Sequence, residues 1–195
     1  MNISSLIISP FLGIALGLFG FGVVLLYDYR QAPPTPAASR LTALISCIGA
    51  AGVLLATISL FFLTPLPVMS PFATIPIIAL ALVSVTLLIR SVYTEIPHSE
   101  IRTGLKRLVI RSGSYAWSRH PGFLWYCLLV LAIALRMQHF RVWAVGFFLV
   151  VLDLLVVVIE DRILFPRIFE DYGRYQRDVP MLIPRFKVAD NRDHE

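Results

Sequence analysis

Five apolar runs constrain the fold of this chain more than any other feature of its sequence. Most of them approach the roughly 20 residues that a helix needs to span the hydrocarbon core of a bilayer, although the fourth run is short for a full crossing. The chain lacks the alternation that builds a barrel, so only helix satisfies its backbone in lipid. We therefore predict an all-α integral membrane protein with about five transmembrane helices. The runs are about Ile3–Tyr27, Leu41–Leu63, Phe72–Ile89, Pro121–Leu135 and Val142–Ile159.

The composition supports the same class of protein. Of the 195 residues, 57% are hydrophobic and only 15% are charged, whereas a soluble domain carries about 25% charged residues. This length leaves room for a single membrane domain, residues 1–195, with three N-terminal spans in residues 1–90. The formal net charge is +5, but the basic residues lie between apolar runs. Membrane lipid headgroups are therefore the expected partners of this charge, and nucleic acid is not.

Cysteine, histidine and the N-terminus exclude several other features. Cys47 and Cys127 both lie in apolar runs and are interpreted as small hydrophobic residues, not as a disulfide or metal ligands. The four scattered histidines have no metal-ligand spacing, so we predict no metal site. The N-terminus lacks the basic segment of a signal peptide, which predicts that the first run is kept as a span.

The polar segments between the runs are expected at the membrane surface. Asp28–Arg40 is a polar, Pro-rich turn, and Ser91–His120 carries seven charged residues. After Glu160, apolar residues recur at near-helical spacing, which predicts an interfacial amphipathic helix that Pro166 kinks or restarts. The apolar residues of that helix are Ile163, Leu164, Ile168, Phe169, Tyr172 and Tyr175, and a short interfacial segment is expected around Leu105, Leu108, Val109 and Ile110.

The fourth and fifth runs are separated only by the tight turn Arg136–Arg141, which predicts a C-terminal helical hairpin. The hairpin brings Ser112–Phe123, at the start of the fourth run, close to Glu160-Asp161, at the end of the fifth. Ser91–His120 holds five Lys and Arg residues and the tail after Glu160 holds seven, against two at the hairpin tip. The positive-inside rule therefore places the N-terminus outside and the C-terminus, with both polar segments, in the cytoplasm.

Three places in the hairpin can carry chemistry. Pro121 suits the first position of a helix, whose free N–H groups favour an anion, and Arg119 adds a bidentate donor. Glu160 and Asp161 lie where a carboxylate still reaches water. Asp153 lies about two turns deeper, where a charge costs ~2.5–3.5 kcal/mol, and shares a helix face with Glu160. A helix cap with snorkelling basic residues, and a helix end in the headgroup layer, are the alternative structural interpretations, and the role of Asp153 stays open.

Together these residues resemble the isoprenylcysteine carboxyl methyltransferase family and its bacterial relatives, a wider group that includes membrane phospholipid N-methyltransferases. The family pattern is G-x-Y…RHP-x-Y, then an acidic pair, then Y-x-x-Y-x-x-x-V-P. The resemblance covers about Leu108–Pro184, and the first three spans match only as apolar helices. The matching residues are Gly113, Tyr115, Arg119, His120, Pro121, Glu160, Tyr172, Tyr175, Val179 and Pro180.

The resemblance implies an enzyme that binds S-adenosyl-L-methionine and transfers its methyl group to a lipophilic small molecule or lipid arriving from the membrane. Residues 91–195 are then the cofactor-binding catalytic part, with catalytic roles for Glu160 and Arg119. The implied cofactor-binding residues are Val109, Ile110, Tyr115, His120, Pro121, Gly122, Phe123 and Glu160.

The sequence departs from the family pattern on the acceptor side. Phe123 replaces a tyrosine, Trp125 replaces a glycine, and Val156 stands where carboxyl methyltransferases carry a substrate-binding arginine. With Val156, Trp125 and Asp153 as the substrate-facing residues, a neutral or amine acceptor is favoured over an isoprenylcysteine carboxylate. The alternative is a non-catalytic lipid-binding or assembly protein that retains the fold. The sequence leaves the acceptor and the oligomeric state open.

Overall fold

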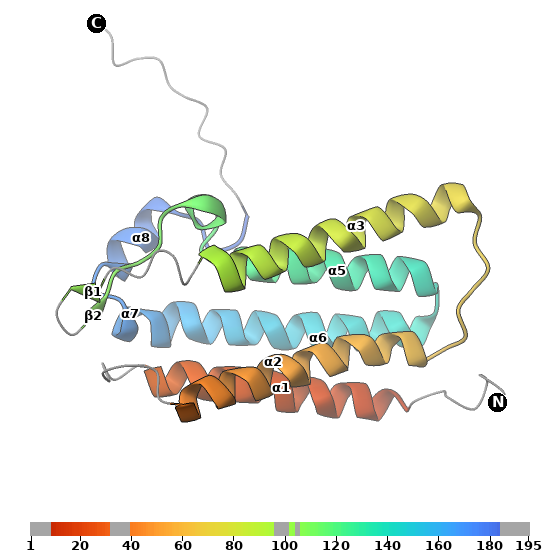
Figure 1. Ribbon diagram of the computed structural model, residues 1–195, viewed down its shortest axis with the longest axis horizontal. Coiled ribbons are helices and arrows are strands. Elements are labelled where there is room, and N and C mark those ends of the chain that lie inside the picture. The colour runs from red at the N-terminus through yellow and green to blue at the C-terminus, as the bar shows by residue number, and fades with distance from the viewer. Residues whose placement is uncertain (1–8, 32–39, 96–101, 104–105, 184–195) are drawn as a thin grey trace, which may run out of the picture.

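The computed structural model describes residues 9–31, 40–95, 102–103 and 106–183, and these form a bundle of long antiparallel helices (Figure 1). Five helices of 17 to 22 residues make up the described part of the bundle, and two-residue strands pair beside it. The protein is therefore all-α apart from this strand pair. The helices are α1 (Pro10–Gln31), α2 (Arg40–Ser59), α3 (Pro71–Ile89), α5 (Pro121–Met137) and α6 (Phe140–Ile159), and the strands are β1 (Arg102–Thr103) and β2 (Lys106–Arg107).

The helices have the length and surface of membrane spans. In the described part of the chain, four helical segments are long and apolar enough to cross a bilayer, and α5 is a shorter apolar helix. Large apolar side chains cover the outside of the bundle; on α3, Phe72 is 92% exposed and Leu82 64% exposed. Apolar surface of this extent suits lipid rather than water. The prediction of a multi-pass, all-α membrane protein is confirmed.

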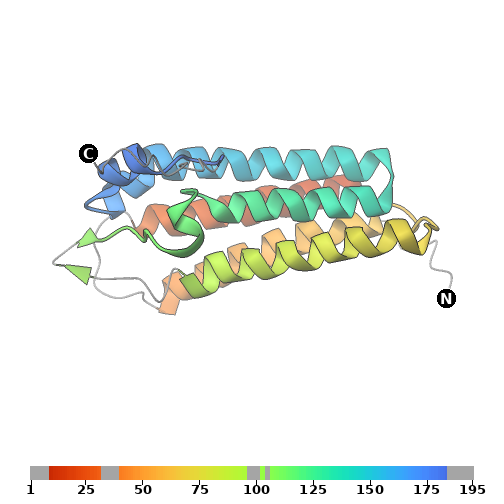
Figure 2. The same cartoon turned by 90° about the horizontal axis from the view of Figure 1, so that it is seen from above.

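The helices pack in the order α3, α5, α6, α1, α2. Figure 2 shows α3, α5 and α6 side by side, with α1 and α2 behind them. The C-terminal hairpin, α5 and α6, is thus central, and its prediction is confirmed. Its core side chains include Val130, Leu149 and Val156. The backbones of α1 and α2 touch, because a Cβ added at Gly20 would lie 2.4 Å from Val53 N. The short 3-10 turn that ends α2, Leu60–Phe62, also contacts the hairpin.

Three helices continue farther than the hydropathy pattern predicts. α1 includes Asp28, so the prediction that the polar turn begins there is wrong. α3 continues into the π-helical segment η3 (Arg90–Glu95), and α6 continues through the π-helical segment η5 (Glu160–Leu164) into α7 (Phe165–Ile168). Hydropathy marks the lipid boundary, whereas helical hydrogen bonds continue past it with polar side chains. The predicted start of the first run at Ile3 lies outside the described residues.

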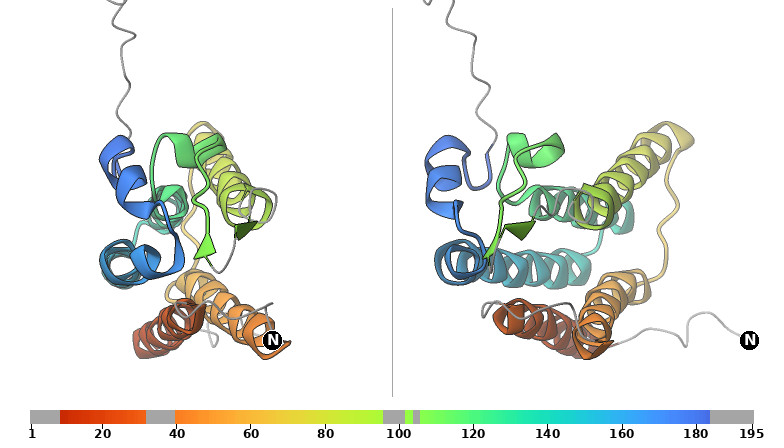
Figure 3. Two further views of the ribbon diagram at one scale, coloured as in Figure 1. Left: turned by 90° about the vertical axis from the view of Figure 1, so that its left-hand side faces the viewer. Right: turned by 60° about the vertical axis from the view of Figure 1, so that its left-hand side comes forward.

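The polar segments gather at one end of the bundle, which we call the site end, where α1, α3 and α6 finish and α5 begins (Figure 1). Residues 108–120 pass between α3 and the last helix, α8 (Tyr172–Asp178), as the end-on view in Figure 3 shows. Arg111 binds Asp171 and Asp178 on the tail side. On the α3 side, Ser114 donates from its backbone and its hydroxyl to Glu95.

Local conformation at the site end follows from particular residues. Gly113 has φ 62°, a left-handed conformation that suits glycine, and it lies against the Glu95 carboxylate. It opens the short 3-10 helix η4 (Gly113–Ala116), whereas residues 108–110 are neither helix nor strand. The predicted amphipathic tail helix is two helices, because Phe169 is extended and separates α7 from α8. Pro166 lies in the first turn of α7, where the predicted restart occurs, and Leu105 lies outside the described residues.

Candidate functional site

His120 and the residues before it are held by the chain's own tail. Pro121 begins α5, as predicted, and His120 is the residue that precedes the helix. The backbone amide of Arg119 donates to Pro180 O at 3.0 Å, and that of His120 donates to Met181 O at 3.3 Å. The Ser118 hydroxyl donates to the same Met181 carbonyl at 3.1 Å. The entry to α5 is therefore fixed by the segment that carries the Val-Pro pair of the tail.

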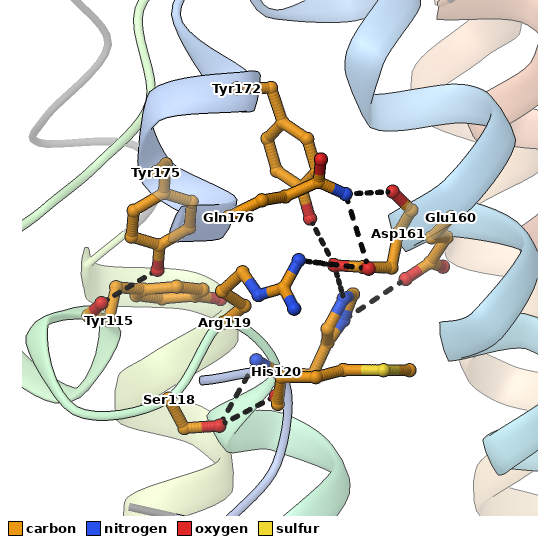
Figure 4. A network of polar contacts seen from close by, with 10 residues as sticks. Tyr115, Ser118, Arg119, His120, Glu160, Asp161, Tyr172, Tyr175 and Gln176 are labelled. Atoms are coloured by element: carbon orange, nitrogen blue, oxygen red, sulfur yellow. Dashed lines mark hydrogen bonds and ion pairs between the residues drawn. The ribbon is translucent and has the colours of Figure 1, made fainter. Parts of the chain in front are cut away.

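Asp161 is the centre of the polar network in Figure 4. Its side-chain oxygens accept from Arg119 Nη1 at 2.7 and 2.9 Å and from the Tyr172 hydroxyl at 2.6 Å. Gln176 donates to its backbone carbonyl at 2.9 Å. Asp161 is only 4% exposed, and a buried carboxylate needs such partners. This carboxylate therefore joins η5 to the segment before α5 and to α8. Sequence reasoning assigned this role to neither member of the acidic pair.

His120 lies between the two members of the acidic pair. Its Nε2 is 3.4 Å from Asp161 Oδ1, and its Nδ1 is 3.6 Å from Glu160 Oε2. Its ring stacks on Phe165 at a centroid distance of 5.5 Å. Burial, the largest effect, lowers the pKa of His120, and the nearby Asp161 offsets this only in part. The imidazole is therefore neutral at pH 7 and has a single N–H for two carboxyl neighbours.

Glu160 meets a residue that sequence reasoning missed. Its buried carboxyl group interacts electrostatically with the carboxyl group of Asp28, which lies near the end of α1. Two neighbouring carboxylates repel each other, so the pair favours a shared proton or a bound positive charge. The order of the predicted spans could have indicated this contact. One crossing and five crossings end on the same side of the membrane, so the end of the first run and the end of the fifth lie on one side.

Backbone geometry contributes to the position of both acidic residues. They begin a π-helical segment in which the Phe165 amide donates to the Glu160 carbonyl, five residues earlier. Single π-helical turns inside α-helices are frequent at functional sites, because the extra residue re-aims the side chains. The α-helix α6 ends at Ile159, as the fifth run predicts, but the chain stays helical, so Glu160 and Asp161 lie in a π-helical continuation and not at a free helix end.

Two nitrogen atoms of the network have no hydrogen-bond partner. Arg119 Nε and His120 Nε2 are buried and form no hydrogen bond within the described residues, and the same holds for Trp125 Nε1 on α5. Buried polar nitrogens in native proteins almost always find a hydrogen-bond partner, so these atoms indicate a missing one. An anionic group such as a carboxylate fits the Arg119–His120 side of the site. The carboxyl pair Asp28–Glu160 fits a positive charge on the other side.

Tyrosines form the wall beside Arg119. The Tyr175 hydroxyl donates to the Tyr115 carbonyl at 2.6 Å, and the Tyr115 hydroxyl lies 3.4 Å from the Ser91 carbonyl. Burial is the main cause that raises the pKa of Tyr115, Tyr172 and Tyr175. All three phenols therefore stay neutral and act as hydrogen-bond donors.

The other predicted cofactor-binding residues have structural contacts of their own. The Val109 amide donates to Asp171 Oδ1 at 3.0 Å, and its side chain packs on the tail tyrosines. Gly122 faces Leu88 and Val92 at the end of α3. Ile110 is buried, and Phe123 is half-buried. The structure therefore brings Arg119, His120 and Glu160 together and places these four residues in the surrounding framework.

The predicted substrate-facing residues lie deeper in the hairpin. Val156 is buried in the core of the bundle. Asp153 has Tyr126 and Cys127 of α5 as electrostatic neighbours, so it faces its hairpin partner, as expected, and Glu160 lies beyond it on the same helix. Trp125 is half-buried on α5. Among the described residues, no group of His, Cys, Asp and Glu could hold a metal ion.

Comparisons with protein-family models, with curated proteins and with solved structures find no match to this chain. A function is therefore inferred from the residues of the site and from their arrangement.

Proposed function

We propose that this chain is an integral membrane S-adenosylmethionine-dependent methyltransferase that acts on a lipophilic acceptor, similar to the isoprenylcysteine carboxyl methyltransferases. One observation carries the proposal. Arg119 and His120, just before α5, meet Glu160 and Asp161, 40 residues farther along the chain, at 2.7 to 3.6 Å. These are the segments that the family pattern joins, and Arg119 Nε and His120 Nε2 are buried there without a hydrogen-bond partner.

The residues of the site suit the parts of this cofactor. Arg119 Nε and His120 Nε2 would bind the carboxylate, and Glu160 would bind the ammonium group or the ribose hydroxyls. Bound S-adenosylmethionine supplies a methyl group that its sulfonium already activates. The protein therefore needs to orient the reactants and exclude water, more than to transfer protons. The buried ring of His120, stacked on Phe165, serves both purposes.

The deeper residues favour particular acceptors. A carboxylate acceptor would need a cation near Val156, but this side chain lies among the apolar residues of the core. A neutral or amine acceptor needs no cation at this position. Asp153, on the same helix, supplies a negative charge on the side that faces α5.

The site is proposed to face the cytoplasm. Arg30, Arg90, Arg111, Arg162 and Arg174 are at the site end, whereas Arg136 and Arg141 are at the hairpin tip. By the positive-inside rule, the site end and the C-terminus are then cytoplasmic and the N-terminus is outside.

Binding of radiolabelled S-adenosylmethionine to the detergent-purified full chain tests the proposal. The wild type should bind the label, and Glu160→Ala and His120→Ala should each bind it at least about 10-fold more weakly, because each loses a buried polar contact. Glu170→Ala, at an exposed carboxylate, is the matched control and should bind like the wild type. No binding by the wild type, or equal binding by all four proteins, would contradict the proposal.

A non-catalytic lipid-binding or assembly role is the second candidate, and the packing of the hairpin favours it. A Cβ added at Gly146 on α6 would lie 2.8 Å from Val130 Cγ1 on α5, so the two helices are in close contact there. Val156 is buried on the same helix. Wild-type protein that is folded and binds lipid, but binds no labelled cofactor, would establish this second role.

A further inference from the structure

The first helix contributes a carboxyl group to the candidate site. α1 packs along α6 and contacts η5. At this contact, the carboxyl groups of Asp28 and Glu160 are electrostatic neighbours. The family pattern begins at about Leu108, so it contains neither α1 nor Asp28. Asp28 is therefore a residue whose function has to be derived from its surroundings.

These surroundings carry more negative than positive charge. Arg119 already binds Asp161 through Nη1. No lysine or arginine among the described residues forms an ion pair with Asp28 or Glu160, and Asp153 adds a third carboxyl group nearby. Buried negative charge without a cation is costly, so it calls for a proton or a bound positive charge.

His120 provides an independent indication that a ligand belongs here. Its side chain is only 5% exposed, and it lies against Glu160 with Nδ1 at 3.6 Å. Its Nε2 is 3.4 Å from Asp161 Oδ1 but is not aligned for a hydrogen bond and has no other partner in the described structure. A buried ring nitrogen without a hydrogen bond is rare unless a ligand supplies the missing atom. Nε2 faces Asp161, and the other ring nitrogen faces Glu160. A ligand whose anionic group satisfies Nε2 therefore lies one imidazole ring away from Glu160, where its positively charged group can reach the carboxyl pair.

We propose that Asp28 and Glu160 together bind a positively charged group of a ligand, so that the site is complete only with the first helix. This inference rests on the proposed function and adds a recognition residue to it. The positive charge has two possible sources with the same chemistry, since carboxylates bind both. One is the ammonium or sulfonium group of S-adenosylmethionine, and the other is the protonated amine of a lipophilic acceptor.

Three probes separate these sources in the detergent-purified full chain. S-adenosylmethionine carries both cationic groups, S-adenosylhomocysteine keeps the ammonium but lacks the sulfonium, and dodecylamine represents an amine acceptor, with dodecanol as its neutral match. Affinities are measured for the wild type, Asp28→Asn, Asp28→Glu and Glu170→Gln. The last variant removes a carboxylate that is exposed.

The proposal expects Asp28→Asn to lose about 10- to 100-fold in affinity for a cationic probe, as for one buried hydrogen bond to a charged group. Asp28→Glu should recover part of this loss, and Glu170→Gln should show none. A loss for both nucleosides identifies the ammonium group, and a loss for S-adenosylmethionine alone identifies the sulfonium. A loss for dodecylamine alone identifies the acceptor amine.

Two results would overturn the inference. One is an Asp28→Asn variant that matches the wild type with every cationic probe. The other is an equal loss for dodecylamine and dodecanol together with a lower unfolding temperature, because a structural defect does not distinguish charge. Wild-type protein that binds neither nucleoside contradicts the proposed function instead. In that case, the comparison of dodecylamine with dodecanol still decides whether the carboxyl pair recognises a cation.

Discussion

At the scale of single residues, Glu160 and Asp161 contact different partners. Asp161 makes the contacts that hold the site together, with Arg119, Tyr172 and Gln176, and its position in a π-helical turn contributes to this arrangement. Glu160 faces Asp28 and His120, where charge is in excess. Two adjacent carboxylates therefore differ in their contacts: Asp161 binds its protein neighbours, and Glu160 is the one that we propose binds a ligand.

Replacement of Asp161 by Asn should destabilise the protein by about 3 kcal/mol, because Arg119 would stay buried without its partner charge. The two side chains are 6% and 11% exposed, so water cannot replace the lost contact. The free energy of unfolding in detergent, measured by denaturant titration, checks this value.

Asp178→Asn is the matched control for that substitution. Asp178 also pairs with an arginine, Arg111 at 3.1 Å, but it is 54% exposed. Its loss should cost less than about 1 kcal/mol, as is usual for exposed ion pairs. Equal destabilisation by the two substitutions would contradict the structural role of Asp161.

At the scale of helices, close contact between backbones positions α1. Gly20 of α1 and Gly52 of α2 face each other, and a Cβ at Gly20 would lie 2.7 Å from the Gly52 carbonyl carbon. Small residues permit such an approach between membrane helices. Because α1 also carries Asp28, this contact helps to set where the carboxyl group of the first helix meets Glu160.

Gly20→Ala should lower the free energy of unfolding by about 1–3 kcal/mol, because the added methyl group has only backbone to displace. Gly22→Ala on the same helix meets nothing within 4 Å. That control should be neutral or stabilising by up to about 1 kcal/mol, since alanine favours helix over glycine. Thermal unfolding of both variants in one detergent makes the comparison, and similar behaviour of the two would refute the close contact.

At the scale of the whole molecule, five helices bring distant segments to one end. The end of α1, the end of α3, residues 108–120 and the tail all meet there, as Figures 1 and 3 show. Arg136 lies at the opposite end of the bundle, where it donates to the Pro67 carbonyl at 2.9 Å. The asymmetry of charge predicts one orientation in the membrane.

Thiol labelling in intact cells tests that orientation. In a variant with Cys47 and Cys127 replaced by Ala, a membrane-impermeant maleimide should label Arg141→Cys at the hairpin tip. It should label Arg174→Cys at the site end only after the membrane is permeabilised. Both positions are exposed, so burial does not confound the result. The reverse pattern would place the site outside the cytoplasm.

The sequence alone was sufficient for the membrane fold and for one half of the site. Lengths of apolar runs predict the crossings, and the short turn after the fourth run predicts the hairpin, which necessarily brings His120 near Glu160. These inferences depend on local properties of the chain and on the thickness of a bilayer, so they need no knowledge of how the helices pack.

Only the tertiary structure identified Asp28 as a partner of Glu160, Asp161 as the centre of the network and the close packing between α5 and α6. The physical reason is that lipid surrounds helices that are apolar on nearly every side, so hydropathy does not indicate which face meets which neighbour. The order of the helices and the π-helical turn at Glu160 set those faces, and both depend on contacts between segments far apart in the chain.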